Sequence, residues 1–150
     1  MVLKILVPTD GSEPSDNAVE YAVKLAKLYE GELLILNVVS TSIPTAYHGV
    51  SIKEELIEEM EEEGKRIVGR SVNNAKSQDV NAEGLVRHGL PDKEIIALAK
   101  ERDDIELVVM GAYGKNFIER QLVGSKTERV LRGITELDVP LVIIPCPCKK

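Results

Sequence analysis

The sequence predicts an α/β protein in which an open, five-stranded parallel sheet carries helices on both faces. Short apolar runs alternate with longer segments of helical spacing from one end of the chain to the other. The runs LLILNVV and ELVVMG show no regular polar alternation, as expected of strands that are covered on both faces. With 150 residues, 43% of them hydrophobic, the chain is large enough for one domain over residues 1–150.

Each predicted strand is a short run rich in apolar or β-branched residues. The predicted ranges, in chain order, are Leu3–Val7, Leu33–Val39, Val80–Arg87, Leu107–Met110 and Val139–Ile144. Because a helical segment stands between each strand and the next, every crossover returns the chain in the same direction, and the strands are predicted to be parallel.

Four helices are predicted in the intervals between these strands. They cover Ser15–Glu30, residues 52–77, Pro91–Arg102 and a segment that begins at Ser125. Gly31 suits the residue after the first helix, and Pro91 suits the first turn of the third. The second helix is expected to loosen near Gly64. Its acidic run, KEELIEEMEEEGKR, has the consecutive spacing of a solvated face and not the spacing of metal ligands.

The charge and composition of the chain exclude some classes of partner. A formal net charge of −6 argues against nucleic acid, whose binding depends on clusters of basic residues. The apolar runs are too short to span a membrane and the N-terminus lacks a signal-peptide pattern, so we expect a cytoplasmic protein. Cys146 and Cys148 fit spectator thiols of a reducing compartment, with intermolecular pairing or soft-metal binding as the alternatives.

The stretch VVMGAYGKNFIERQLVGSKTE, residues 108–128, carries the strongest functional signal. Gly111 and Gly114 follow a predicted strand, where glycine allows backbone conformations closed to other residues and lets a ligand approach. Gly124 precedes a helix that begins at Ser125, and the first amides of a helix attract phosphate through free N–H groups and the helix dipole. The side chains that would add donors or charge to such a site are those of Ser125, Lys126 and Thr127.

Two interpretations of this helix start remain. SKTE, residues 125–128, fits a capping box in which Ser125 caps its own helix and Glu128 reciprocates. A ligand is favoured by position, because ligands of open parallel sheets lie beyond the carboxyl ends of the strands. The segment PTDGS, Pro8–Ser12, ends the first strand at the same edge, and we expect the two loops to meet there.

The pattern G-x2-G-x9-G-S that begins at Gly111, together with PTDGS, resembles the universal stress protein family, in particular its ATP-binding branch. The glycine and proline of residues 89–91 and the final VPLVIIP match as well, and the resemblance extends from Lys4 to Pro145. It implies a Rossmann-like fold with strand order 3-2-1-4-5, a homodimer, the binding of ATP or AMP, and a role in the stress response.

The resemblance also implies roles for individual residues. Asp10 would accept a hydrogen bond from the ribose hydroxyls or the adenine amino group, because its charge repels phosphates; the alternative is a turn residue in Asp-Gly-Ser. Val38 would offer backbone and apolar contact to adenine. The residues implied beside the adenosine are Pro8, Thr9, Asp10, Val38, Met110 and Gly111, and those at the phosphates are Gly114, Gly124, Ser125 and Thr127.

Three residues depart from the family pattern. Ala112 and Tyr113 stand where a small hydroxyl residue and a His or Arg are common, and Lys126 stands where an apolar residue is usual. Lys126 has two interpretations, pairing with a phosphate or pointing into water. We expect these departures to affect the affinity for the nucleotide and the preference among its phosphates, more than the existence of the site.

These observations favour a nucleotide-binding regulatory protein with little or no hydrolysis. The chain lacks the phosphate loop G-x-x-x-x-G-K-[ST], and neither His48 nor His88 has a neighbour that suggests a catalytic triad. ATP or AMP would bring Mg²⁺ or Mn²⁺ on its phosphates. We expect two copies to join through antiparallel contacts of the strand at residues 139–145, because an edge strand invites pairing.

Two other functions remain as alternatives. A dimeric interaction module of the same fold, without nucleotide binding, is supported by Ala112, Tyr113 and the apolar edge strand. An ATP-hydrolysing enzyme of the wider adenine-nucleotide-binding α/β group is the other alternative, and steady turnover of ATP would favour it.

Overall fold

The structure, a computed structural model, describes residues 2–41, 50–113 and 123–145, except for the side chains of residues 50–52. Strands and helices alternate along the chain, which confirms the predicted fold class. The elements in chain order are β1 (Lys4–Pro8), α1 (Glu13–Tyr29), β2 (Glu32–Ser40), α2 (Val50–Ser77), β3 (Ala82–Gly89), α3 (Pro91–Glu101), β4 (Ile105–Gly111), α4 (Ser125–Ile134), the 3-10 turn η1 (Thr135–Leu137) and β5 (Leu141–Ile144).

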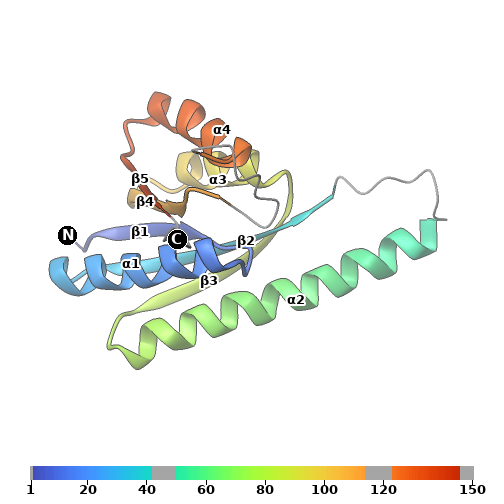
Figure 1. Cartoon of the computed structure of the whole chain (residues 1–150), viewed down its shortest axis with the longest axis horizontal. Helices are drawn as coiled ribbons and strands as arrows, with labels where there is room; N and C mark the ends of the chain where they lie inside the picture. The colour runs from blue at the N-terminus through green and yellow to red at the C-terminus, as the bar shows by residue number, and fades with distance from the viewer. Residues whose placement is uncertain (1, 42–49, 114–122, 146–150) are drawn as a thin grey trace, which may run out of the picture.

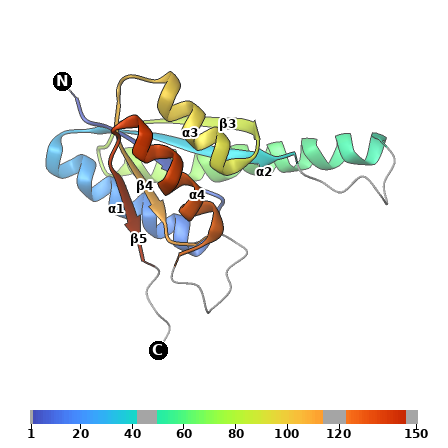
Figure 2. The same ribbon diagram turned by 90° about the horizontal axis from the view of Figure 1, so that it is seen from above.

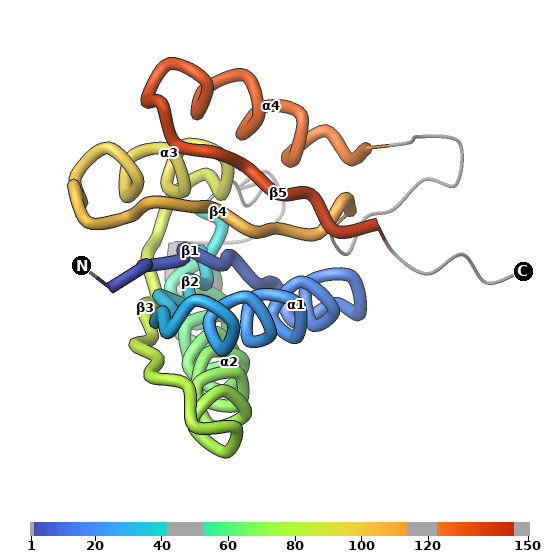
Figure 3. Tube along the Cα trace, turned by 90° about the vertical axis from the view of Figure 1, so that its left-hand side faces the viewer, coloured from blue at the N-terminus to red at the C-terminus, as the bar shows by residue number. Residues whose placement is uncertain are grey.

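The strands form one parallel sheet in the order β3-β2-β1-β4-β5, which confirms the expected order (Figure 3). α1 and α2 lie on one face of the sheet, and α3 and α4 lie on the other (Figure 1). Because helices cover both faces of β1, its Ile5, Leu6 and Val7 are fully buried. Ile5 and Val7 join the core beneath α1 and α2, and Leu6 joins the core beneath α3 and α4.

α1 begins at Glu13 instead of Ser15 because a serine outside the predicted range caps it. Oγ of Ser12 accepts the amide of Ser15 at 3.4 Å. Pro14 occupies the first turn, where a missing N–H is no loss. The helix ends before Glu30, which adopts a left-handed conformation with φ 53°. The cap places Ser15 at the end of β1, beside the candidate site.

α2 runs without interruption through Gly64, so the predicted loosening of the helix there is wrong. A β-carbon on Gly64 would lie 2.5 Å from Oδ1 of Asn37 on β2, and one on Gly84 of β3 would collide with Val68 of α2. Glycine at these two positions lets the helix lie close against the sheet. The N-terminal part of α2 projects beyond the sheet (Figure 2). Neither α2 nor any other helix within the described ranges is long and apolar enough to cross a membrane.

β5 is shorter than predicted. It begins at Leu141 and not at Val139, because α4 is followed by η1 and by Asp138, which takes a left-handed conformation with φ 54°. β5 forms one edge of the sheet and pairs with β4.

Candidate functional site

A cavity of about 310 Å³ opens at the carboxyl ends of β1, β2 and β4, where the order of the strands reverses. Its volume is in the range of small-molecule sites, roughly 300–1,000 Å³. The predicted site residues that line it are Pro8, Thr9, Asp10, Val38, Met110, Gly111, Lys126 and Thr127. Gly124 and Ser125 are not among the lining residues, and Gly114 lies outside the described part of the chain.

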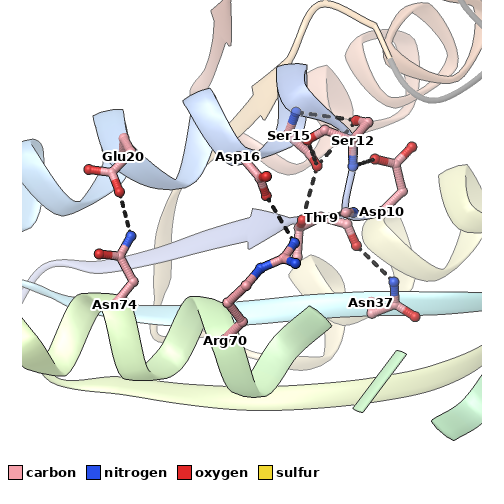
Figure 4. A network of polar contacts seen from close by, with 10 residues as sticks. Thr9, Asp10, Ser12, Ser15, Asp16, Glu20, Asn37, Arg70 and Asn74 are labelled. Carbon is pink, nitrogen blue, oxygen red and sulfur yellow. Dashed lines mark hydrogen bonds and ion pairs between the residues drawn. The ribbon is translucent and has the colours of Figure 1, made fainter. Parts of the chain in front are cut away.

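Hydrogen bonds hold the segment after β1 in a fixed shape (Figure 4). Thr9 is buried, its amide donates to the carbonyl of Leu36 at 2.8 Å, and its hydroxyl lies 3.0 Å from Oγ of Ser15. Oδ1 of Asp10 accepts the amide of Ser12 at 3.0 Å. The carboxylate of Asp10 therefore stabilises the turn, as one of its two interpretations predicts. A carboxylate can accept several hydrogen bonds, so this role leaves the other interpretation in place.

Asn37 is a site residue that the sequence analysis missed. It lies on β2, is 7% exposed and lines the cavity, and its Nδ2 donates to the carbonyl of Thr9 at 2.9 Å (Figure 4). The hydrogen bond fastens the end of β1 to β2 at the entrance to the turn. A signal was present in the sequence, since Asn37 is the polar residue within the apolar run LLILNVV.

α2 forms one wall of the cavity, although most carboxylates of its acidic run are exposed, as the interpretation of a solvated face predicts. Met60, Glu63, Gly64 and Ile67 line the cavity. The carboxylate of Glu63 also accepts the guanidinium of Arg66 at 2.7 Å, one turn along the helix. The sequence contains one indication that α2 approaches the sheet, namely Gly64 in the middle of a long helix.

The start of α4 is fastened to the end of β4. The amide of Gly124 donates to the carbonyl of Ala112 at 2.7 Å, and Oγ1 of Thr127 donates to the carbonyl of Gly111 at 3.0 Å. Thr127 is 3% exposed. Its hydroxyl proton therefore goes to the backbone, and Thr127 positions the helix where the resemblance implied a contact with phosphate.

α4 does not begin with the capping box that one interpretation expected. Gly124 is the N-cap and Ser125 is the first helical residue, and no described side chain makes a capping hydrogen bond. Glu128 does not reach back to the helix start, since its carboxylate accepts the guanidinium of Arg132 at 2.7 Å. The first amides of a helix have no partner within the helix, and those of Ser125, Lys126 and Thr127 make no hydrogen bond to another described residue.

Gly111 is required for a different reason from the predicted one. Among the described glycines, those with positive φ are Gly11, at 80°, and Gly89, at 145°, so the expectation of a special conformation at Gly111 is wrong. A β-carbon on Gly111 would lie 2.9 Å from the carbonyl oxygen of Pro14. Its glycine therefore allows the end of β4 to pack against the start of α1.

The other chemistry-bearing residues lie away from the cavity lining or outside the described residues. Nε2 of His88 lies 3.6 Å from a carboxylate oxygen of Glu61 on α2, and neither residue lines the cavity. His48, Cys146 and Cys148 lie outside the described ranges. Within those ranges no group of three or more His, Cys, Asp or Glu side chains could hold a metal ion.

Residues 1–145 match the model of the universal stress protein family. The universal stress protein MJ0531 of Methanocaldococcus jannaschii is 31% identical over 147 residues, which are 98% of this chain and 84% of that protein. The solved structure of universal stress protein UspA from Lactobacillus plantarum matches with a TM-score of 0.82 at 28% identity, over 95% of this chain and 97% of that one. A universal stress protein family protein from Arabidopsis thaliana, solved with AMP bound, matches with a TM-score of 0.65 at 15% identity, over 97% and 93% of the two chains, which shows the fold alone.

Proposed function

The chain belongs to the universal stress protein family, and from this premise we propose that it is a stress-response regulatory protein that binds ATP or AMP. Mg²⁺ or Mn²⁺ would be carried by the phosphates. The protein would act in the cytoplasm as one domain, as a nucleotide-dependent homodimer with little or no hydrolysis.

The start of α4 is the observation that carries the proposal. No described side chain caps the helix, so a ligand at its N-terminus would meet both the first amides and the positive end of the helix dipole. Lys126 lines the cavity beside them. A phosphate at this position would meet N–H donors, a favourable dipole and a cation.

Other residues of the cavity lining suit an adenosine. Val38 and Met110 supply apolar surface, and Asp10 supplies a carboxylate that can accept hydrogen bonds from ribose hydroxyls or an amino group. The AMP bound by the Arabidopsis thaliana protein supports the same class of ligand.

Calorimetric titration of the full chain with ATP and with AMP, in the presence of Mg²⁺, tests the proposal. We expect saturable binding of at least one of them with a Kd below about 1 mM, and weaker binding of adenosine because it lacks the phosphates. Absence of saturable binding by both nucleotides below that concentration contradicts the proposal.

The position of β5 supports the homodimer. The carbonyl of Pro140 accepts the amide of Val108 on β4, and the carbonyl of Ile144 accepts the amide of Ala112, which follows β4. Because backbone groups alternate in direction along a strand, the N–H and C=O groups of Leu141 and Ile143 face away from β4. These groups form an edge on which a second copy would pair through residues 139–145.

A dimeric interaction module without nucleotide is the second candidate function. Tyr113, which departs from the family pattern, lines the cavity, and a large side chain at this place reduces the room for a ligand. The module would be dimeric but would bind neither ATP nor AMP. The same titration therefore distinguishes it from the first candidate function.

A further inference from the structure

Asn37 has more hydrogen-bonding capacity than the protein uses. A side-chain amide offers two N–H donors and an oxygen with two lone pairs. Within the described part of the chain Asn37 makes one side-chain hydrogen bond, from Nδ2 to the carbonyl of Thr9 at 2.9 Å. The residue is 7% exposed, and buried polar groups are normally paired. Oδ1 of Asn37 is not among the fully buried, described side-chain atoms without a partner, so its remaining capacity is open to water or to a ligand in the cavity that the residue lines.

The orientation of the amide is fixed by its partner. The carbonyl of Thr9 can only accept a hydrogen bond, so the nitrogen of Asn37 must face it and Oδ1 must lie on the other side. Oδ1 lies near Gly64 of α2, 2.5 Å from the place that a β-carbon there would take. Asn37 and Gly64 both line the cavity. The cavity wall at this point thus carries a fixed hydrogen-bond acceptor.

Charges divide the cavity into two ends. Asp10 and Glu63 line it on the side of β1 and α2, and Lys126 lines it at the start of α4. β1 lies between β2, which carries Asn37, and β4, which leads to α4. A ligand with a hydrogen-bond donor at one end and an anion at the other is complementary to this arrangement.

We propose that Asn37 is a specificity-determining residue whose Oδ1 accepts a hydrogen bond from the 6-amino group of adenine. The inference rests on the proposed nucleotide binding and extends it to the choice of base. A 6-oxo purine places an acceptor opposite Oδ1, and an unsubstituted purine places no polar group there. Both would cover the acceptor without giving it a donor, which lowers affinity.

The proposal differs from a purely structural role for the Asn37–Thr9 hydrogen bond. If Asn37 only holds the end of β1, its loss weakens all purine nucleotides equally, and the ratio of their affinities is unchanged. If Oδ1 recognises the amino group, its loss removes the preference itself. The ratio of affinities for ATP and for its 6-position analogues therefore separates the two roles.

Titrations with ATP, inosine triphosphate and purine riboside triphosphate, on the full chain with Mg²⁺, test this. For the wild-type protein we expect ATP to bind at least about tenfold more tightly than either analogue. Asn37→Leu, of similar volume but without polar atoms, is expected to bring the three affinities within about threefold of one another. Asn37→Asp keeps an acceptor and loses the donor to Thr9, so it is expected to bind all three more weakly and to retain the preference for ATP.

Equal wild-type affinities for ATP and the analogues, or an unchanged ratio in Asn37→Leu, would overturn the inference while the proposed function stands. If Asn37→Leu does not fold, Asn37→Ala, which also lacks the acceptor, takes its place, and the same loss of the preference for ATP is expected. Binding of none of the three nucleotides by the wild-type protein would overturn the proposed function and, with it, the inference.

Discussion

Oδ1 of Asn37 lies 2.5 Å from the position that a β-carbon on Gly64 would occupy. Real Cβ atoms do not approach an oxygen so closely, so the absence of a side chain at Gly64 is what brings α2 against β2. Since Asn37 in turn holds the carbonyl of Thr9, the helix, the strand and the turn after β1 form one packed unit around the cavity.

Gly64→Ala is expected to weaken both folding and nucleotide binding. The added methyl group must displace the amide of Asn37 or move α2 away from the sheet, and overpacking of this kind costs about 1–3 kcal/mol. We expect urea denaturation to show a loss of unfolding free energy in that range, and titration to show weaker binding of ATP.

Gly69→Ala is the matched control on the same helix. A β-carbon on Gly69 has nothing within 4 Å, so the substitution gains helix propensity and is expected to stabilise the protein by about 0.5–1 kcal/mol. A Gly64→Ala variant that is as stable as Gly69→Ala and binds ATP normally would show that the contact with Asn37 does not fix α2.

Lys126→Gln tests whether the lysine pairs with a phosphate or points into water. Because Lys126 is exposed, a phosphate contact would be partly screened, and we expect ATP to bind about two- to fivefold more weakly with adenosine binding unchanged. Lys100→Gln, on the exposed last turn of α3, serves as the control and should leave both affinities unchanged. Equal affinities of wild type and Lys126→Gln for ATP would assign Lys126 to solvent.

Ile143→Pro is expected to abolish the homodimer and to preserve the fold of the chain. Its N–H faces away from β4, so proline removes a group needed by a second copy and none used inside the sheet. Light scattering should give twice the chain mass of 16.5 kDa for the wild type and for Ile143→Val, which keeps the N–H, and a single chain mass for Ile143→Pro. A wild-type monomer at micromolar concentration contradicts the proposed assembly.

The acid stability of the protein is expected to depend on Asp104, at the end of the sheet opposite the cavity. Hydrogen bonds from Arg102, at 3.0 and 3.1 Å, and from Lys4, at 2.8 Å, hold the pKa of the Asp104 carboxyl well below its usual range. A carboxyl with a depressed pKa contributes stability above its unfolded pKa of about 3.9, and this contribution is lost as the pH falls toward the folded value.

Asp104→Asn should therefore melt at a slightly lower temperature than wild type at pH 7, and the difference should shrink as the pH falls below about 4. Asp103→Asn is the control, because Asp103 is exposed and makes no ion pair among the described residues. A difference that grows on acidification would contradict the assignment. ATP affinity should be the same in all three proteins at pH 7, since the cavity lies at the other end of the strands.

The sequence predicts the fold well because each strand and helix has its own local pattern of apolar residues. It also finds the turn after β1 and the start of α4, because both are short motifs at the ends of strands. The wall formed by α2 was missed because the contact between Asn37 and Gly64 joins residues that are far apart in the chain. A polar residue in a strand and a glycine in a helix can be recognised as a contact only when the packing of the two elements is known.

The roles at the start of α4 illustrate a second limit. The letters SKTE fit a capping box, yet Gly124 takes the cap position, and its amide donates to the carbonyl of Ala112. Thr127 was placed among the phosphate ligands; its hydroxyl donates to the carbonyl of Gly111, and its amide remains a predicted phosphate donor. A motif specifies which residue types are present, and the backbone of the neighbouring strand decides which of them is left for a ligand.

The central claim is that the first amides of α4 bind the phosphate of an adenine nucleotide, and NMR of the ¹⁵N-labelled chain tests it most directly. We predict that the amide resonances of Ser125 and Lys126 shift strongly on saturation with ATP and Mg²⁺ and hardly at all on saturation with adenosine. Resonances of Ser125 and Lys126 that stay in place while ATP saturates the protein would contradict the claim.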